Sequence, residues 1–454
     1  MTIELLSDRE VRQAYEADAS GLRLVPDFVA RPESIDEVVE VLRRARTDRI
    51  PITCAGAQSS TTAASITDKG ILLSMRALDS ISEIDVGART VRVGPGAYVA
   101  DVKRKAAASG LLFAPDPTSE EESTIGGAIA CNASGARTYK YGATRRYVQA
   151  LTVVLASGET MHFRRPNLEK NTVGYAFAHD PIDWFIGSEG TLGVVVDAEL
   201  SLLPLPAEVL GLAVFFASEE EALRFVITAR ENLDVSPRCI EYFDGLALEI
   251  ARQSPTGSAL PVNARAMIYT EEEVTDDADA TLGRWADLIG EASDIEPLVF
   301  QGDAKLKEAR QFRHSIPATM NERGGRHRDA GGRKVSTDWA VPYRRLPEAI
   351  AAARRFARDA SITMPVIYGH AGNGHPHQNF IARDAKELAT IEKVVEQTLR
   401  QVLSLGGTVA AEHGIGKIKR RWLPLQMNEL QIAMMTAVKR ELDPLHLLAP
   451  GNIL

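Results

Sequence analysis

The feature that most constrains this chain is a series of short glycine clusters in its first half. A proline-containing segment, PDPT at 115–118, precedes TIGG at 124–127, NASG at 132–135, YG at 141–142 and GSEGTLG at 187–193. Glycine lets backbone N–H groups approach a phosphate without an intervening side chain, and Ser, Thr and Asn supply further donors. A single cluster would be read as a tight turn, whereas the whole series predicts a loop-rich domain that binds a pyrophosphate.

A different glycine pair, Gly94 and Gly96, resembles the start of a dinucleotide fingerprint but does not complete it. The run TVRVGPGAYVADVKRKA predicts a strand, a turn and a helix. The fingerprint needs a third Gly or Ala near position 99, where this chain has Val99, and Pro95 lies within the turn. The sequence therefore argues against a Rossmann-type nicotinamide site.

Length and composition narrow the class of protein. A chain of 454 residues is too long for one core, which predicts two or three domains. A net charge of -9 argues against nucleic-acid binding, although a local basic pocket could still bind a small anion. The 3 cysteines are widely spaced, which predicts no disulfide framework and a reducing cytosol.

The start of the sequence and its apolar runs favour a cytoplasmic protein. The segment MTIELLSDREVRQAYEAD lacks the basic and apolar parts of a signal peptide. No window approaches the length of uninterrupted apolar sequence that a membrane-spanning helix needs, so we expect no transmembrane span. A peripheral position at a membrane stays open.

Histidines concentrate in YGHAGNGHPH, residues 368–377. Its glycines and proline exclude a continuous helix, so we expect a loop between two strands. His370, His375 and His377 are three of the chain's 9 histidines, a density that favours a metal or catalytic site. A second motif, AEHGIGK at 411–417, places a carboxylate beside an imidazole on a glycine-bounded turn, which offers a ligand and a base.

The glycine series as a whole resembles the FAD-binding domain of the vanillyl-alcohol oxidase and p-cresol methylhydroxylase superfamily. The resemblance implies an α+β protein: a p-cresol methylhydroxylase-type FAD-binding domain of two α/β subdomains, plus a substrate or cap domain with an antiparallel sheet covered by helices. The predicted domains are 1–205 for FAD, 206–425 for the substrate domain with its metal and catalytic motifs, and 426–454 for a C-terminal segment returning to the FAD domain.

The resemblance also implies which residues contact FAD. The loop AGAQSS, 55–60, stands where the superfamily has its glycine-rich pyrophosphate loop, although it keeps only one glycine. His162 and His179 lie outside the segments through which some relatives attach the flavin, so we expect non-covalent FAD. The expected contacts are Ala55, Gly56, Ala57, Gln58, Ser59, Ser60, Pro115, Asp116, Thr118, Thr124, Gly126, Gly127, Asn132, Ser134, Gly135, Tyr141, Gly142, Glu189, Gly190, Gly193 and Asn452.

The two motifs of the second half, with the ending LDP…PGNIL, resemble one branch of that superfamily over nearly the whole chain: the D-lactate dehydrogenases, glycolate oxidases and D-2-hydroxyglutarate dehydrogenases. The resemblance implies that His370, His377 and Glu412 bind a divalent metal (Zn, Mn or Fe) and that His413 is the catalytic base. Two histidines and one carboxylate leave coordination positions open for a substrate. His375 falls where many relatives carry Asn, so we expect a role beside the metal rather than on it.

Two cations complete the predicted catalytic set. Arg313 matches an arginine that grips the substrate carboxylate in this branch, a task suited to a bidentate guanidinium; the alternative is an arginine on a helix surface. Lys334 is a weaker candidate. Ser336 stands where the 2-hydroxyglutarate enzymes have a lysine, which favours lactate-sized substrates.

The expected function is FAD-dependent oxidation of a small 2-hydroxy acid, D-lactate first, to the 2-oxo acid. The α-hydrogen would leave as hydride to flavin N5 while His413 takes the hydroxyl proton, with Arg313 and the metal holding the acid. The electron acceptor stays open among a quinone, a cytochrome, an electron-transfer flavoprotein and oxygen, and so does a homodimer. Alternatives are a flavoprotein subunit of a multi-subunit glycolate oxidase, a D-2-hydroxyglutarate dehydrogenase, and a transferase like the ether-lipid synthases.

Overall fold

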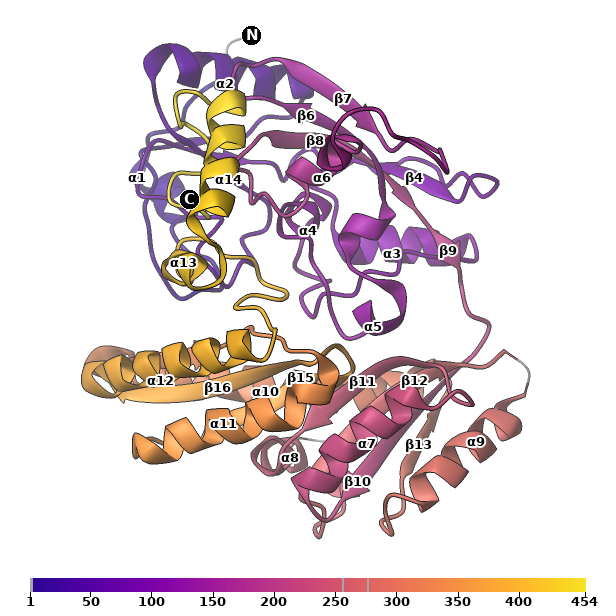
Figure 1. Cartoon of the computed structure of the whole chain (residues 1–454). Coiled ribbons are helices and arrows are strands. Elements are labelled where there is room, and N and C mark those ends of the chain that lie inside the picture. Colours follow the sequence, from indigo (N-terminus) through magenta and orange to yellow (C-terminus); the bar gives the residue numbers. More distant parts are fainter. Residues whose placement is uncertain (1–2, 255–256, 276) are drawn as a thin grey trace. The chain divides into compact units, whose positions relative to one another are not determined.

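The structure, a computed structural model, describes residues 3–254, 257–275 and 277–454, which divide into two units (Figure 1). Unit 1 consists of the chain up to Gly135, Gly142–Leu205 and Glu412–Leu454, and unit 2 of Ala136–Tyr141 and Pro206–Ala411. The short segment Ala136–Tyr141 thus packs in unit 2, although it lies inside the glycine series, and the chain returns to unit 1 at Glu412.

Two sheets organise unit 1. The first is parallel, in the order β1 (Phe28–Ala30), β3 (Ile71–Ser74), β2 (Ile52–Ala55). The second is antiparallel, in the order β4 (Thr90–Val93), β8 (Val194–Ser201), β6 (Val148–Val154), β7 (Thr160–Arg164). A short pair, β5 (Leu111–Leu112) and β9 (Leu203–Pro204), closes the segment before the chain enters unit 2.

Helix α2 (Ile35–Asp48) of unit 1 begins directly after Ser34, a residue type that favours helix N-caps. The Ser34 hydroxyl accepts a hydrogen bond from Glu37 N at 3.3 Å, which satisfies one of the free N–H groups of the first turn. Val38 and Leu42, at helical spacing, are buried in the core that includes β1 and β3. The other helices of unit 1 are α1 (Arg9–Gln13), α3 (Val99–Ala108), α4 (Ile125–Cys131), α6 (Ile182–Phe185), α13 (Leu423–Gln426) and α14 (Glu429–Leu442).

A seven-stranded sheet forms the centre of unit 2, and each of its described strand pairs is antiparallel. Its order is β13 (Leu298–Gln301), β10 (Val209–Phe216), β12 (Ala266–Glu273), β11 (Pro237–Phe243), β15 (Val366–His370), β16 (His375–Asp384), β14 (Gly331–Ser336). The α+β class and the antiparallel sheet predicted for this region are confirmed.

Helices pack on both faces of this sheet. Helices α8 (Gly245–Arg252) and α10 (Asp303–Gly325) share a hydrophobic core with Phe215 of β10. The next residue, Phe216, points to the opposite face, where its ring contacts Phe225 of α7 (Glu219–Glu231) at 5.3 Å between centroids. The remaining helices of unit 2 are α5 (Thr138–Tyr141), α9 (Ala278–Gly290), α11 (Leu346–Asp359) and α12 (Ala385–Ser404). Among all described helices, none has the length and apolar character needed to cross a bilayer.

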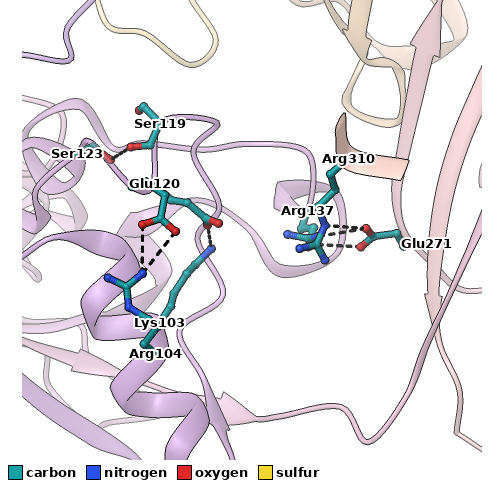
Figure 2. Close-up of polar contacts among 9 residues, drawn as sticks. Lys103, Arg104, Ser119, Glu120, Ser123, Arg137, Glu271 and Arg310 are labelled. Carbon is teal, nitrogen blue, oxygen red and sulfur yellow. Dashed lines mark hydrogen bonds and ion pairs between the residues drawn. The ribbon is translucent and has the colours of Figure 1, made fainter. Parts of the chain in front are cut away.

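A buried carboxylate, Glu271 on β12, gathers arginines within unit 2 (Figure 2). Arg137 Nε lies 2.8 Å from Glu271 Oε2, and Arg238 Nη1 and Arg310 Nε each lie 3.6 Å from a carboxylate oxygen. Burial raises the pKa of Glu271, but the charges of the three arginines outweigh it and hold the pKa well below its usual range. Glu271 is therefore ionised at neutral pH and ties the Ala136–Tyr141 segment to the sheet.

Replacing Glu271 by Gln should lower the free energy of unfolding by about 3–5 kcal/mol, because it leaves buried guanidinium groups without their counter-charge. Glu396→Gln is the matched control within unit 2: Glu396 pairs with Arg400 on an exposed helix face, and its loss should cost about 0.3–0.5 kcal/mol. Urea unfolding of both variants measures the difference. Equal, small losses would show that Glu271 is not the structural anion proposed here.

Candidate functional site

The predicted cofactor loops of unit 1 lie against one another through their glycines. A Cβ atom on Gly56 would lie 2.2 Å from Thr124 Oγ1, and one on Gly135 would lie 2.0 Å from the Asp116 carbonyl oxygen. Both distances are far too short for any side chain, so glycine is required by the close approach of the loops. Four of the predicted loops therefore meet in two pairs, AGAQSS with TIGG and PDPT with NASG, and their glycines and Thr, Ser and Asn donors suit a pyrophosphate.

Helix α4 connects two of these loops, the TIGG and NASG clusters, which lie at its two ends. At its start, Thr124 Oγ1 accepts a backbone hydrogen bond at 3.3 Å, and at its end Asn132 adopts the left-handed conformation with a φ of 50°. The backbone N–H groups of Gly187 and Glu189 donate to carbonyl oxygens of α4 at 3.0 and 2.9 Å. The cluster at 187–193 is therefore fastened to the TIGG and NASG clusters, although over fifty residues of chain lie between them.

The AEHGIGK motif is anchored to the same region by Glu189. The Glu189 carboxylate accepts hydrogen bonds from Ile415 N at 2.6 Å and Gly416 N at 2.7 Å. Burial raises the pKa of Glu189, and these two bonds partly oppose the shift. Gly414 has a φ of 73°, and a Cβ atom there would lie 2.5 Å from Glu189 Oε1. The turn that presents His413 is thus held by a carboxylate from the glycine series.

The C-terminal segment also reaches these loops. Asn452 Nδ2 donates to the carbonyl oxygens of Ala64 at 2.9 Å and Glu189 at 3.3 Å, while its Oδ1 accepts from Lys417 Nζ at 2.8 Å. Burial lowers the pKa of Lys417 to about 8. Asn452 therefore lies with the other predicted cofactor residues of unit 1.

The side chains of two predicted cofactor residues form hydrogen bonds with protein groups outside the predicted cofactor loops. Gln58, in the loop that follows β2, donates from Nε2 to the Tyr15 carbonyl oxygen at 2.9 Å. Tyr141 belongs to unit 2, where its hydroxyl donates to Glu273. Any contact of these two residues with a cofactor stays a prediction.

The three clustered histidines share one face of the unit 2 sheet. Strands β15 and β16 extend to His370 and His375, so the turn between them, Ala371–Asn373 and one glycine, is shorter than the predicted loop. The register pairs His370 with His375 and Tyr368 with His377, and residues paired across antiparallel strands lie on the same face. All three imidazoles are buried, with ring centroids 4.7 to 5.4 Å apart.

Arg313, Glu241 and His370 form a connected polar chain on this face. His370 Nδ1 lies 2.6 Å from Glu241 Oε1, and His370 Nε2 lies 3.1 Å from Arg313 Nη2. Arg313 Nε lies 2.8 Å from Glu241 Oε2, and the Arg313 side chain is only 14% exposed. Arg313 is therefore not a surface arginine. Sequence reasoning missed Glu241, whose signal is an acidic residue within an otherwise apolar strand, CIEYF.

Asp338 is a second carboxylate that sequence reasoning did not assign to the site. Its Oδ1 lies 3.1 Å from His375 Nε2, and both side chains are almost completely buried. Asp338, His375 and His377 each offer a ligand atom within 4.8 Å of the others. The Asp338 carbonyl oxygen also accepts a hydrogen bond from Ala411 N at 2.8 Å, and Glu412 is the next residue along the chain.

Lys334 lies in another part of unit 2. It belongs to β14, and its Nζ donates to Asn321 Oδ1 at 2.9 Å. Asn321 is eight residues beyond Arg313 on α10, which corresponds to about 12 Å along the helix axis. Burial lowers the pKa of Lys334 to about 8. Within unit 2, the structure therefore groups Arg313 with His370 but not with Lys334.

Both regions match known protein families. Residues 26–164 match the FAD binding domain family, and residues 205–453 match the family described as FAD linked oxidases, C-terminal domain. The chain therefore belongs to the FAD-linked oxidases and is an FAD-dependent oxidoreductase. The predicted superfamily and the p-cresol methylhydroxylase-type fold are confirmed.

Curated relatives resemble the chain along nearly its full length. It is 30% identical to the glycolate oxidase subunit GlcD of Bacillus subtilis (strain 168), over 97% of this chain and 92% of that protein. It is 26% identical to the D-lactate dehydrogenase of Anaerostipes hadrus, over 98% of this chain and 93% of that protein. It is 29% identical to a D-2-hydroxyglutarate dehydrogenase of Xanthomonas citri pv. viticola, over 94% of this chain and 89% of that protein.

A solved structure shows the same fold at lower identity. An alkyldihydroxyacetonephosphate synthase superposes with a TM-score of 0.72 and 16% identity, covering 98% of this chain and 83% of that one. This likeness concerns the fold alone.

Gly414→Ala tests whether the His413 turn depends on its contact with Glu189. The added Cβ would strain a left-handed residue and displace a carboxylate that two backbone N–H groups hold, so we expect a loss of about 2–4 kcal/mol in unfolding free energy. Gly110→Ala is the control: it has a φ of 70° but open space around its Cβ, and should lose about 1 kcal/mol. Urea unfolding and the flavin content are measured for both variants. Equal losses of unfolding free energy in Gly414→Ala and Gly110→Ala would show that Glu189 does not hold the His413 turn.

Proposed function

We propose that this chain oxidises a small 2-hydroxy acid, and that D-lactate is its best single substrate candidate. The observation that carries the proposal is the buried Arg313, linked to Glu241 and to His370 on the face that also holds the other two histidines. A guanidinium beside clustered imidazoles suits an anion whose neighbouring hydroxyl must be held and deprotonated. The names of three relatives, which refer to glycolate, D-lactate and D-2-hydroxyglutarate, support this substrate class.

Arg313 would hold the substrate carboxylate. Its Nε lies beside Glu241, which fixes the plane of the guanidinium, and a planar guanidinium suits a two-pronged contact with a carboxylate. Ser336 in place of a second lysine leaves a distal carboxylate without an obvious partner, which supports lactate over 2-hydroxyglutarate. Lys334 remains a candidate second cation, although its contact with Asn321 gives it no direct part in gripping a carboxylate at Arg313.

A divalent metal is proposed for the histidine cluster, with His370, His377 and Glu412 as the ligands implied by the resemblance. The donor chemistry fits: imidazole and carboxylate groups suit Zn, Mn or Fe. Glu241 beside His370 Nδ1 corresponds to the carboxylate that commonly orients a metal-binding imidazole. When bound, such an ion acidifies a substrate hydroxyl.

FAD, when bound, supplies the acceptor for the hydride. We propose that it binds non-covalently to the joined glycine loops of unit 1, because no histidine lies in the expected attachment segments. We propose His413 as the base that removes the hydroxyl proton, with its turn held by Glu189 through Ile415 and Gly416.

A second candidate is a flavoprotein subunit of a multi-subunit glycolate oxidase. The 30% identity to a glycolate oxidase subunit favours it. Turnover of the isolated chain with an artificial dye acceptor distinguishes the two, because a complete dehydrogenase needs no further subunit. The natural electron acceptor stays open among a quinone, a cytochrome, an electron-transfer flavoprotein and oxygen.

The test of the proposed function is anaerobic reduction of the bound flavin by a panel of D- and L-2-hydroxy acids. We expect D-lactate to bleach the flavin fastest, with its L form at least about 100-fold slower, because a misplaced hydrogen forfeits the gain from orientation. Glycolate and D-2-hydroxyglutarate in the same panel test the alternatives. A flavin that no hydroxy acid reduces would refute the proposal.

Arg313→Lys should raise KM for the acid about 10- to 100-fold, although the positive charge is kept. An ammonium group cannot contact Glu241 and also make a two-pronged bond to the substrate carboxylate. Arg326→Lys, at the exposed C-cap of α10, is the control and should keep the wild-type KM. Steady-state kinetics with the best substrate measure the change; an unaltered KM in Arg313→Lys would exclude it from substrate binding.

A further inference from the structure

We propose that Asp338 and His375 are direct ligands of the divalent metal, together with His377, so that this chain holds the ion with donors that its resemblance to the family does not imply. The inference rests on the metal of the proposed function. It also reverses the expectation that His375, where many relatives carry Asn, only lies beside the metal.

The spacing of Asp338 and His375 fits two neighbouring positions on one ion. Their Oδ1 and Nε2 atoms are 3.1 Å apart. Ligand atoms about 2.1 Å from a metal and about 90–100° apart are separated by about 3.0–3.2 Å. The distance alone would equally suit an ion pair, so the position of His377 decides.

The rings of His375 and His377 have the separation expected for two imidazoles on one ion. Their centroids are 4.7 Å apart. With a metal–nitrogen bond of about 2.1 Å, each centroid lies about 3.2 Å from the ion, and two such rings at about 90–110° have centroids about 4.5–5.3 Å apart. The ligand atoms of His377, His375 and Asp338 also lie within 4.8 Å of one another, so a small movement closes them on one ion.

Burial and backbone structure favour a built site. Asp338, His375 and His377 are each less than 9% exposed. The two histidines alternate along β16, so the strand itself points both imidazoles to one face. Thr337 N bonds to the Gln378 carbonyl oxygen at 3.0 Å, which holds the loop with Asp338 beside that strand.

His370 is the informative comparison. In the part of the chain that the structure describes, His375 and His377 belong to a group of residues whose ligand atoms all lie within 4.8 Å of one another. His370 does not belong to this group. The two ring nitrogens of His370 face Glu241 and Arg313 instead. Losing His375 should therefore weaken metal binding at least as much as losing His370.

The experiment measures Zn²⁺ binding by the FAD-containing protein after chelator treatment, without substrate. His375→Asn, Asp338→Asn and His370→Asn are compared with wild type by chelator competition and by X-ray absorption of the bound zinc. We expect His375→Asn and Asp338→Asn each to raise Kd by more than about 100-fold, beyond the usual range for residues that only orient a ligand. The imidazole scattering should fall in His375→Asn and stay unchanged in Asp338→Asn.

His162→Asn is the matched control, because His162 bonds to Thr152 in unit 1 and lies outside the cluster. His375→Gln repeats the test if Asn disturbs the strand, and the flavin spectrum reports folding. Unchanged imidazole scattering in His375→Asn, or a Kd within about 10-fold of wild type, would overturn the proposal. Flavin reduction by hydroxy acids is scored separately, so failure of this donor set and failure of the proposed function give different results.

Discussion

The Glu241 carboxylate is the charge on which the arrangement of unit 2 depends. It is 1% exposed, and it contacts the Arg313 guanidinium and the His370 imidazole with its two oxygens. A buried carboxylate without such partners would be costly, and a guanidinium without the carboxylate would be equally so. The carboxylate, the guanidinium and the imidazole therefore hold one another in position. One strand residue thus sets the orientation of the arginine that is proposed to bind the substrate carboxylate and of an imidazole in the proposed metal site.

Much of the fold could be predicted because its signals are local. The Ser34 cap and the glycine clusters each act over a few residues, and the structure shows the corresponding helix start and close loop contacts. The predicted histidine loop is longer than the observed turn between β15 and β16, because glycines that exclude a helix do not exclude a strand. Gly369, with a φ of 134°, lies inside β15 itself.

The contacts that could not be predicted join residues that are far apart in the sequence. Glu241 and His370 are 129 residues apart, and Glu189 and Ile415 are 226 apart. No periodicity connects such pairs, since their contact arises from sheet order and from the return of the chain. The contact of Lys334 with Asn321 of helix α10 is another such case, because the two residues meet only when the helix packs beside β14.

The segment Ala136–Tyr141 has a consequence for how such a protein can be divided or recombined. Its neighbours Gly135 and Gly142 belong to unit 1, while Arg137 and Lys140 pair with glutamates of unit 2. The polypeptide therefore passes from one unit to the other at 135/136, 141/142, 205/206 and 411/412. No single cut yields either unit whole, so a gene exchange that replaced unit 2 would need matching junctions at all four crossings.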